Sequence, residues 1–258
     1  MTHTRILEFE GGRNFRDMGG YPTIDGRRVK WRTLFRSGTL TRLSAADLDA
    51  VDALSIRSVY DFRTDEERRA EPHPWPRTSE VSVYFRDYVA SAGELRRLAE
   101  LPMPTVDHAR EAMFTIYRTL PYEQADAYRR LFQGAVSGPL PLLFNCSAGK
   151  DRTGVAAALM LSALGVEEDA IIEDFVLTEQ AFDFRKLRGP TNERSAQWGL
   201  NRLPGEVLDV LIGARPDFLA ATFDELERRS GGLEGYLERE LGVGPNEIEA
   251  LRERLLEG

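Results

Sequence analysis

The sequence is poor in the residues that build disulfides and metal sites. Among its 258 residues there are one cysteine and three histidines. A single cysteine excludes a disulfide within the chain, which is typical of proteins from reducing compartments. The histidines lack the spacing of zinc ligands, so we expect no metal and no cofactor. They are His3, His73 and His108.

Long apolar runs are also missing. No apolar stretch approaches the ~20 residues of a membrane-spanning helix, so we expect no transmembrane segment. The first residues lack the basic and apolar regions of a signal peptide, which predicts a cytoplasmic protein and leaves open export without such a signal. A net charge of −8 argues against nucleic acid as a partner. Nothing in the sequence indicates an oligomeric state.

The order of the expected elements indicates one α/β domain over residues 1–258. Short apolar or alternating segments predict strands, and helical patterns separate them. From about residue 167 onward the patterns are almost only helical. Strands that alternate with helices imply a central sheet flanked by helices, here with extra C-terminal helices. The expected strands lie at 28–37, 55–62, 79–85 and 139–146.

Local signals predict several helix boundaries. Thr64, followed three residues later by Glu67, forms the capping box of a short helix. Residues 107–136 indicate one or two helices broken near Pro121. An unpatterned stretch with glycine and proline lies within 180–205, where we expect a lid over the site.

The single cysteine lies in the segment FNCSAGKDRTGV, residues 144–155. Five residues separate Cys146 from Arg152, and the loop is expected between a buried strand and a helix. Unpaired N–H groups at a helix start attract an anion, and their field favours a thiolate. The planar guanidinium of Arg152 suits two phosphate oxygens. A thiolate and a phosphate cradle in one turn predict nucleophilic attack on phosphorus.

Other interpretations of this segment stay open. Cys146 could be only a small buried apolar residue, although Gly149, Thr153 and Gly154 and the strand–loop–helix context count against that. A nucleotide-binding Walker A loop is excluded, because the required Gly-Lys-Ser/Thr run is missing. A sulfurtransferase also uses a cysteine loop, but it does not need the Gly-Lys-Asp-Arg-Thr-Gly run.

At these residues the chain resembles the Cys-x5-Arg protein tyrosine phosphatases. Four further motifs are similar to the bacterial tyrosine and dual-specificity phosphatase family that includes the mycobacterial tyrosine phosphatase B. They are NFRDMGG at 14–20, LFRSGTL at 34–40, DFRTDEER at 61–68 and LEGYLERELGV at 233–243. The resemblance implies a protein tyrosine phosphatase-like α/β fold without a metal. It also implies a phosphorylated protein or a phosphoinositide as substrate, with phosphotyrosine and often phosphoserine/threonine as the ester in a protein.

The resemblance implies a role for each residue of the motif. Cys146 is expected to be the nucleophile that forms a cysteinyl-phosphate, and Arg152 to bind the phosphoryl oxygens. Asp151 is favoured as general acid over Asp61, the other candidate. The remaining candidates bind substrate, support the loop or bond the thiolate. They are Ser147, Ala148, Gly149, Lys150, Thr153 and Arg63.

Three of these candidates have ordinary alternatives. Thr153 could simply be a residue at the start of the helix. Lys150, one of three lysines beside 31 arginines, could contact a second phosphate or simply be solvated. Arg63 could bridge to the loop or pair with surface carboxylates.

One residue departs from the family pattern. Asn145 stands where the family usually has a histidine, and asparagine carries no charge. This leaves open a phosphate-binding pseudophosphatase with weak turnover as the alternative function.

Overall fold

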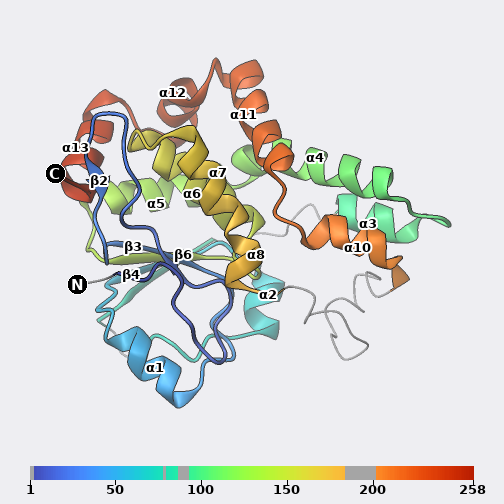
Figure 1. Ribbon diagram of the computed structural model, residues 1–258, viewed down its shortest axis with the longest axis horizontal. Coiled ribbons are helices and arrows are strands. Elements are labelled where there is room, and N and C mark those ends of the chain that lie inside the picture. The colour runs from blue at the N-terminus through green and yellow to red at the C-terminus, as the bar shows by residue number, and fades with distance from the viewer. Residues whose placement is uncertain (1–2, 78–79, 87–92, 184–201) are drawn as a thin grey trace.

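The computed structural model describes residues 3–77, 80–86, 93–183 and 202–258, built around a five-stranded sheet (Figure 1). Four strands run parallel, and the short first strand pairs antiparallel to its neighbour. This arrangement confirms the predicted α/β class. In spatial order the strands are β1 (Arg16–Asp17), β3 (Leu34–Ser37), β6 (Leu142–Asn145), β4 (Ser58–Asp61) and β5 (Ser82–Phe85).

The parallel register brings distant residues together at one edge of the sheet. Ser37, Asn145 and Asp61 are the last residues of β3, β6 and β4, and they lie opposite one another. Sites in such sheets form outside the carboxyl ends of the strands. The Cys146 loop begins at this edge.

Helices cover both faces of the sheet. Figure 1 shows α1 (Ala45–Asp52) on one side and α5 (Ala125–Ser137) with α6 (Asp151–Ala163) on the other. Alternation along β6 explains this, because Leu143 joins the apolar cluster with α1, whereas Leu142 and Phe144 join the larger cluster on the opposite face.

The remaining helical elements surround this core. They are α2 (Asp65–Ala70), α3 (Gly93–Glu100), α4 (Val106–Glu123), α7 (Glu168–Val176), α8 (Thr178–Ala181), α10 (Gly205–Ile212), α11 (Pro216–Ser230), α12 (Leu233–Tyr236), the π-helical η3 (Leu237–Leu241) and α13 (Pro245–Leu255). The C-terminal part is mainly helical, as predicted, but it ends in β7 (Leu256–Glu257). This strand pairs with β2 (Arg28–Val29), a contact that the sequence patterns did not predict.

The expected break between two helices is present, but it lies shortly after Pro121. Pro121 lies inside α4, and the chain breaks at Gln124 instead. A proline in a helix leaves the carbonyl four residues earlier without its N–H partner. Here that carbonyl belongs to Tyr117, and it accepts a hydrogen bond of 2.9 Å from the Thr222 hydroxyl. A side chain from α11 thus replaces the missing donor.

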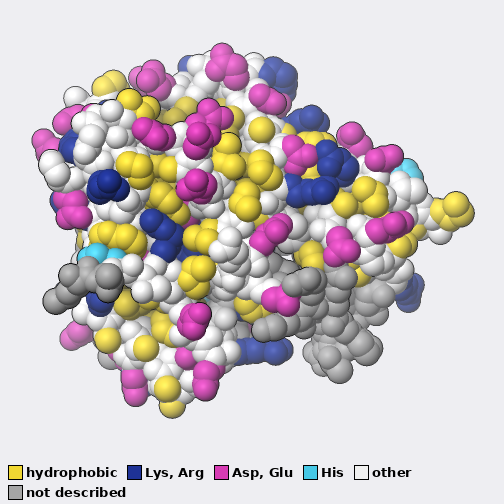
Figure 2. All heavy atoms as spheres, viewed as in Figure 1, with side chains coloured by type: hydrophobic (Ala, Val, Ile, Leu, Met, Phe, Trp, Pro, Cys, Tyr) yellow, Lys and Arg dark blue, Asp and Glu magenta, His cyan; other side chains and the backbone are white. Residues whose placement is uncertain are grey.

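Of the lid expected at 180–205, residues 184–201 lie outside the described part of the chain. The described flanks are α8, which ends at Ala181, and α10, which begins at Gly205. Across the described ranges, no helix has both the length and the apolar character needed to cross a membrane. On the face seen in Figure 2, acidic side chains are spread widely and basic ones form several separate groups.

Candidate active site

The Cys146 loop connects β6 to α6. Cys146 is only 1% exposed, and the backbone N–H of Gly149 donates to its sulfur at 3.2 Å. The loop therefore curls around the sulfur with an N–H group directed at it. This confines the thiol to the helix start, where a negative charge is favoured.

Gly149 fixes the shape of this loop. Its φ of +69° lies in the left-handed region, and an added Cβ would come within 2.5 Å of the Gly38 nitrogen. Its carbonyl accepts hydrogen bonds from Asn14 Nδ2 at 2.8 Å and from Arg36 Nη2 at 2.9 Å. Asn14, which precedes β1, and Arg36 of β3 thus hold the residue whose N–H points at the sulfur.

Arg36 belongs to a buried ionic cluster beneath the loop. Arg36 and Arg16 both pair with Asp174 of α7, and the Tyr21 hydroxyl donates to the same carboxylate at 2.9 Å. Burial and the charge of Arg36 lower the pKa of Arg16 to about 9. Burial opposes ionisation of Asp174, but the two arginines hold its pKa below the ordinary value. Two cations beside one carboxylate leave a net positive charge next to the anion site.

Arg152 is held in a bidentate ion pair. Its Nη1 lies 2.6 Å from Glu67 Oε2, its Nη2 lies 2.9 Å from Glu67 Oε1, and Nη1 also donates to the Phe62 carbonyl at 3.0 Å. Glu67 also caps α2, because its Oε2 accepts the Thr64 N–H at 2.8 Å. The capping box was predicted, whereas its contact with Arg152 was not. The orientation of the guanidinium therefore depends on the first turn of α2.

Asp151 is the more accessible of the two candidate acids. Its side chain is 29% exposed. Its Oδ1 accepts a hydrogen bond from the Tyr117 hydroxyl at 2.8 Å and lies 2.9 Å from Lys150 Nζ. Burial, with the negative charge of Asp151, raises the pKa of Tyr117 well above its ordinary value. The phenol therefore stays protonated and donates to Asp151.

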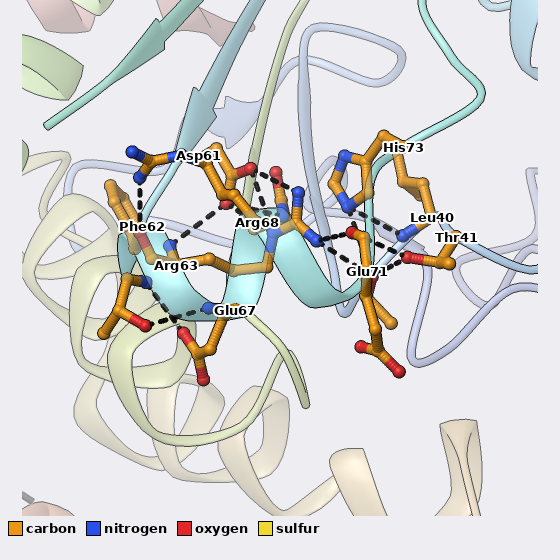
Figure 3. A network of polar contacts seen from close by, with 12 residues as sticks. Leu40, Thr41, Asp61, Phe62, Arg63, Glu67, Arg68, Glu71 and His73 are labelled. Carbon is orange, nitrogen blue, oxygen red and sulfur yellow. Dashed lines mark hydrogen bonds and ion pairs between the residues drawn. The ribbon is translucent and has the colours of Figure 1, made fainter. Parts of the chain in front are cut away.

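Asp61 is engaged by its neighbours. It is 4% exposed, Arg63 Nε lies 3.0 Å from both its oxygens, and Arg63 Nη2 donates to Oδ2 at 2.8 Å. Asn145 Nδ2 donates to Oδ1 at 3.2 Å. Figure 3 shows the Arg63 side chain between Asp61 and Glu71, whose carbonyl accepts from Nη1 at 2.6 Å. Both oxygens of the Asp61 carboxylate therefore already accept hydrogen bonds from other residues of the protein.

The hydrogen bonds of Arg63 also connect to the Cys146 loop through Thr39. Arg63 Nη1 donates to the Thr39 hydroxyl at 3.3 Å, and the Thr39 N–H donates to the Ser147 carbonyl at 3.0 Å. Of the two interpretations of Arg63, this geometry agrees with a bridge to the loop and not with a surface ion pair.

Lys150 differs from both expectations. It is buried instead of solvated, and its ammonium donates to the carbonyls of Leu211 at 2.8 Å and Gly213 at 3.2 Å. These carbonyls end α10, where a cation is favoured. In this structure Lys150 therefore ties the loop to α10 and does not face a second phosphate. The remaining candidates Ser147, Ala148 and Gly149 lie between β6 and α6, and Thr153 lies in the first turn of α6. The buried Thr153 hydroxyl has no hydrogen-bond partner among the described residues.

His73 extends the network seen in Figure 3. Its Nε2 accepts the Leu40 N–H at 3.1 Å, which requires an unprotonated nitrogen. Burial, assisted by the charge of Arg63, lowers the pKa of His73 from 6.5 to about 4. The folded protein therefore holds a neutral imidazole beside the loop.

This pKa gives a prediction for stability. Between pH 6.5 and about 4, the unfolded chain protonates His73 and the folded chain does not, so stability should fall as the pH drops. The full difference is at most ~3.5 kcal/mol, at ~1.4 kcal/mol per pKa unit. The variant His73→Gln can accept the Leu40 N–H without titrating. Urea unfolding across this window should show a shallower pH dependence for the variant, and equal slopes would refute the assignment.

The described residues of the site contain no group of three or more histidine, cysteine or carboxylate side chains able to hold a metal ion. The Cys146 loop and the first turn of α6 bring together a buried thiol, an arginine in a fixed orientation and a partly exposed carboxyl group. Together they form an arrangement suited to a tetrahedral oxyanion.

Likeness to known proteins agrees with this chemistry. A sequence profile described as the tyrosine phosphatase family matches residues 7–257. A protein of Cupriavidus necator, named as a candidate tyrosine-protein phosphatase, is 31% identical over 98% of this chain and 89% of its own length. The triple specificity protein phosphatase PtpB of Mycobacterium tuberculosis is 28% identical over 97% of this chain and 99% of its own.

A third relative, a tyrosine-protein phosphatase of Nostoc commune, is 28% identical over 85% of this chain and 73% of its own length. The expected resemblance to the mycobacterial tyrosine phosphatase B is thereby confirmed, as is the expected class of enzyme. A profile match over nearly the whole sequence, centred on a loop with the required cysteine and arginine, shows that this chain belongs to the tyrosine phosphatase family.

Proposed function

We propose that the protein hydrolyses phosphotyrosine through a cysteinyl-phosphate intermediate. The observation that carries this proposal is the Cys146 sulfur, which lies under the Gly149 N–H in the same loop as Arg152. The sulfur attacks phosphorus, the bond from phosphorus to the tyrosine oxygen breaks, and an acid protonates that oxygen. Water then gives a proton to the deprotonated acid as it attacks the cysteinyl-phosphate, and the bond from sulfur to phosphorus breaks, which releases phosphate and restores both the thiolate and the acid.

Arg152 stabilises the phosphoryl group in both steps. Its guanidinium is already oriented by Glu67, so little conformational entropy is lost when phosphate binds. The net positive charge of the cluster of Arg16, Arg36 and Asp174 supports the same anion from below. These groups act on charge that spreads over the phosphoryl oxygens in the transition state.

Asp151 is the general acid in this proposal. Its Oδ2 receives no hydrogen bond from the described residues, and the side chain is partly exposed. Asp61, in contrast, has both oxygens occupied by Arg63 and one also by Asn145. We assign Asp61 a supporting role in the loop, because a buried carboxylate paired with arginine is a poor proton donor.

A series of aryl phosphates tests this assignment. A general acid matters most when the leaving phenol is weakly acidic, so Asp151→Asn should lower kcat/KM for phosphotyrosine by about 10²–10⁴-fold. The same variant should affect p-nitrophenyl phosphate far less. Asp61→Asn is the matched control and should lower both rates by similar factors. If instead Asp61→Asn discriminates between the substrates and Asp151→Asn does not, the roles are reversed.

The range of substrates is a further part of the proposal. The name of PtpB describes three specificities, and on that likeness we propose that phosphoserine/threonine and phosphoinositides are also substrates. Rates on the three classes with one enzyme preparation test this. We also propose a cytoplasmic location, supported by the single cysteine, which cell fractionation tests.

The alternative is a phosphate-binding pseudophosphatase, which rests on Asn145. Asn145 donates to Asp61, whose charge Arg63 already balances, so the loop is braced without a histidine. This favours an active enzyme. A burst of phenol followed by steady turnover supports the phosphatase, whereas phosphate binding without a burst supports the alternative.

A further inference from the structure

The Tyr117 side chain lies fully buried in α4 beside the Cys146 loop. Its ring packs against Phe175 of α7 and Phe218 of α11, with centroid distances of 6.0 and 5.7 Å. Its carbonyl is bonded by Thr222, as described above. Three helices therefore fix the position from which the hydroxyl reaches Asp151.

Two donors meet on a single oxygen of Asp151. The Tyr117 hydroxyl and the Lys150 ammonium are 2.8 and 2.9 Å from Oδ1, and both donors are buried. Lys150 is itself anchored on the carbonyls at the end of α10. An oxygen that accepts from two donors is a poor place for the acidic proton, so the proton belongs on Oδ2.

We propose that Tyr117 is a positioning residue for catalysis: together with Lys150 it holds Oδ1 of Asp151 and leaves the proton on Oδ2, toward the leaving oxygen. This deepens the proposed function and rests on the acid role of Asp151. When the proton moves to the leaving oxygen, Asp151 becomes a carboxylate. The Tyr117 bond to Oδ1 then becomes charge-assisted and the Lys150 contact becomes an ion pair, so both strengthen, which lowers the barrier to proton transfer.

Tyr117→Phe removes the hydroxyl and keeps the ring. A hydrogen bond to a charged group is worth enough that kcat/KM for phosphotyrosine should fall about tenfold or more. For p-nitrophenyl phosphate, whose leaving group needs little protonation, the change should stay below about twofold. A purely structural role of Tyr117 would lower both rates alike, and that result would overturn the proposal.

Tyr236→Phe is the matched control. Tyr236 is also fully buried, and its hydroxyl makes one hydrogen bond, of 2.6 Å, to the Pro121 carbonyl. Loss of this hydrogen bond should lower the melting temperature, and any change in kcat/KM should be equal for phosphotyrosine and p-nitrophenyl phosphate. A substrate-dependent effect of equal size in this control would contradict a specific role for Tyr117.

The double variant Tyr117→Phe/Asp151→Asn tests whether the tyrosine acts through the acid. It should be no slower on phosphotyrosine than Asp151→Asn alone. Additive losses would show a separate role for Tyr117. If Asp151→Asn itself affects all substrates alike, the acid assignment fails, and the positioning role fails with it. Should Tyr117→Phe not fold, Lys150→Met removes the second donor, and the same dependence on the leaving group is expected.

Discussion

Cys146→Ser should abolish turnover while phosphate still binds. A serine hydroxyl does not ionise near neutral pH, so the attacking anion is lost. The Gly149 N–H, the helix start and Arg152 remain, and they provide the anion site. Steady-state assays and calorimetric titration with phosphate measure the two properties separately.

The melting temperature of this variant is its control, because Cys146 is buried and serine is close to it in size. Binding without turnover at an unchanged melting temperature is the expected result. Appreciable turnover by Cys146→Ser would remove the sulfur from the nucleophile role.

Arg152→Lys should lower kcat/KM by at least ~100-fold. Lysine keeps the positive charge but loses the planar fork, so it cannot span both Glu67 oxygens or two phosphoryl oxygens. Both the orientation of the side chain and the stabilisation of the transition state are therefore weakened. Kinetics on p-nitrophenyl phosphate measure the loss without involving the general acid.

Arg228→Lys is a suitable control for this variant. Arg228 forms a bidentate pair with Glu225 on the exposed surface of α11, through Nε at 2.9 Å and Nη2 at 2.5 Å. Exposed pairs contribute little, so stability and activity of Arg228→Lys should stay nearly unchanged.

A near-normal rate for Arg152→Lys would mean that phosphate binds elsewhere.

The parts of the site predicted from the sequence depend on local signals. The strand before Cys146, the glycine at 149 and the small-residue helix after Arg152 all lie within one short stretch of chain. The capping box of Thr64 and Glu67 is equally local, and the structure contains it. Such features are set by backbone geometry and apolar periodicity over a few residues, which a single sequence displays directly.

The parts that were not predicted depend on contacts between distant segments. Tyr117 lies 34 residues from Asp151, and Arg36 lies 138 residues from Asp174. Nothing in the local pattern distinguishes these side chains from ordinary core or surface residues. The same reason explains Lys150, whose partners at the end of α10 follow it by more than sixty residues. Only the packing of α4, α7 and α10 around the loop brings these groups to the site.

The sequence also could not decide which of Asp61 and Asp151 is the general acid. Asp61 ends a strand and Asp151 begins a helix beside the site, so residue type and spacing leave two candidates for the acid. Their partners in the structure differ and support the proposed choice, since Arg63 and Asn145 contact Asp61, whereas Asp151 keeps one oxygen free of partners from the described residues.

Rapid acid quenching during turnover of p-nitrophenyl phosphate tests the central claim most directly. Peptide mass spectrometry of the quenched protein should find one phosphoryl group on the peptide that contains Cys146, and none in Cys146→Ser. Its appearance should match the burst of p-nitrophenol in time. Steady turnover with no phosphorylated Cys146 peptide at any quench time, or a phosphoryl group on another residue, would contradict the cysteinyl-phosphate mechanism.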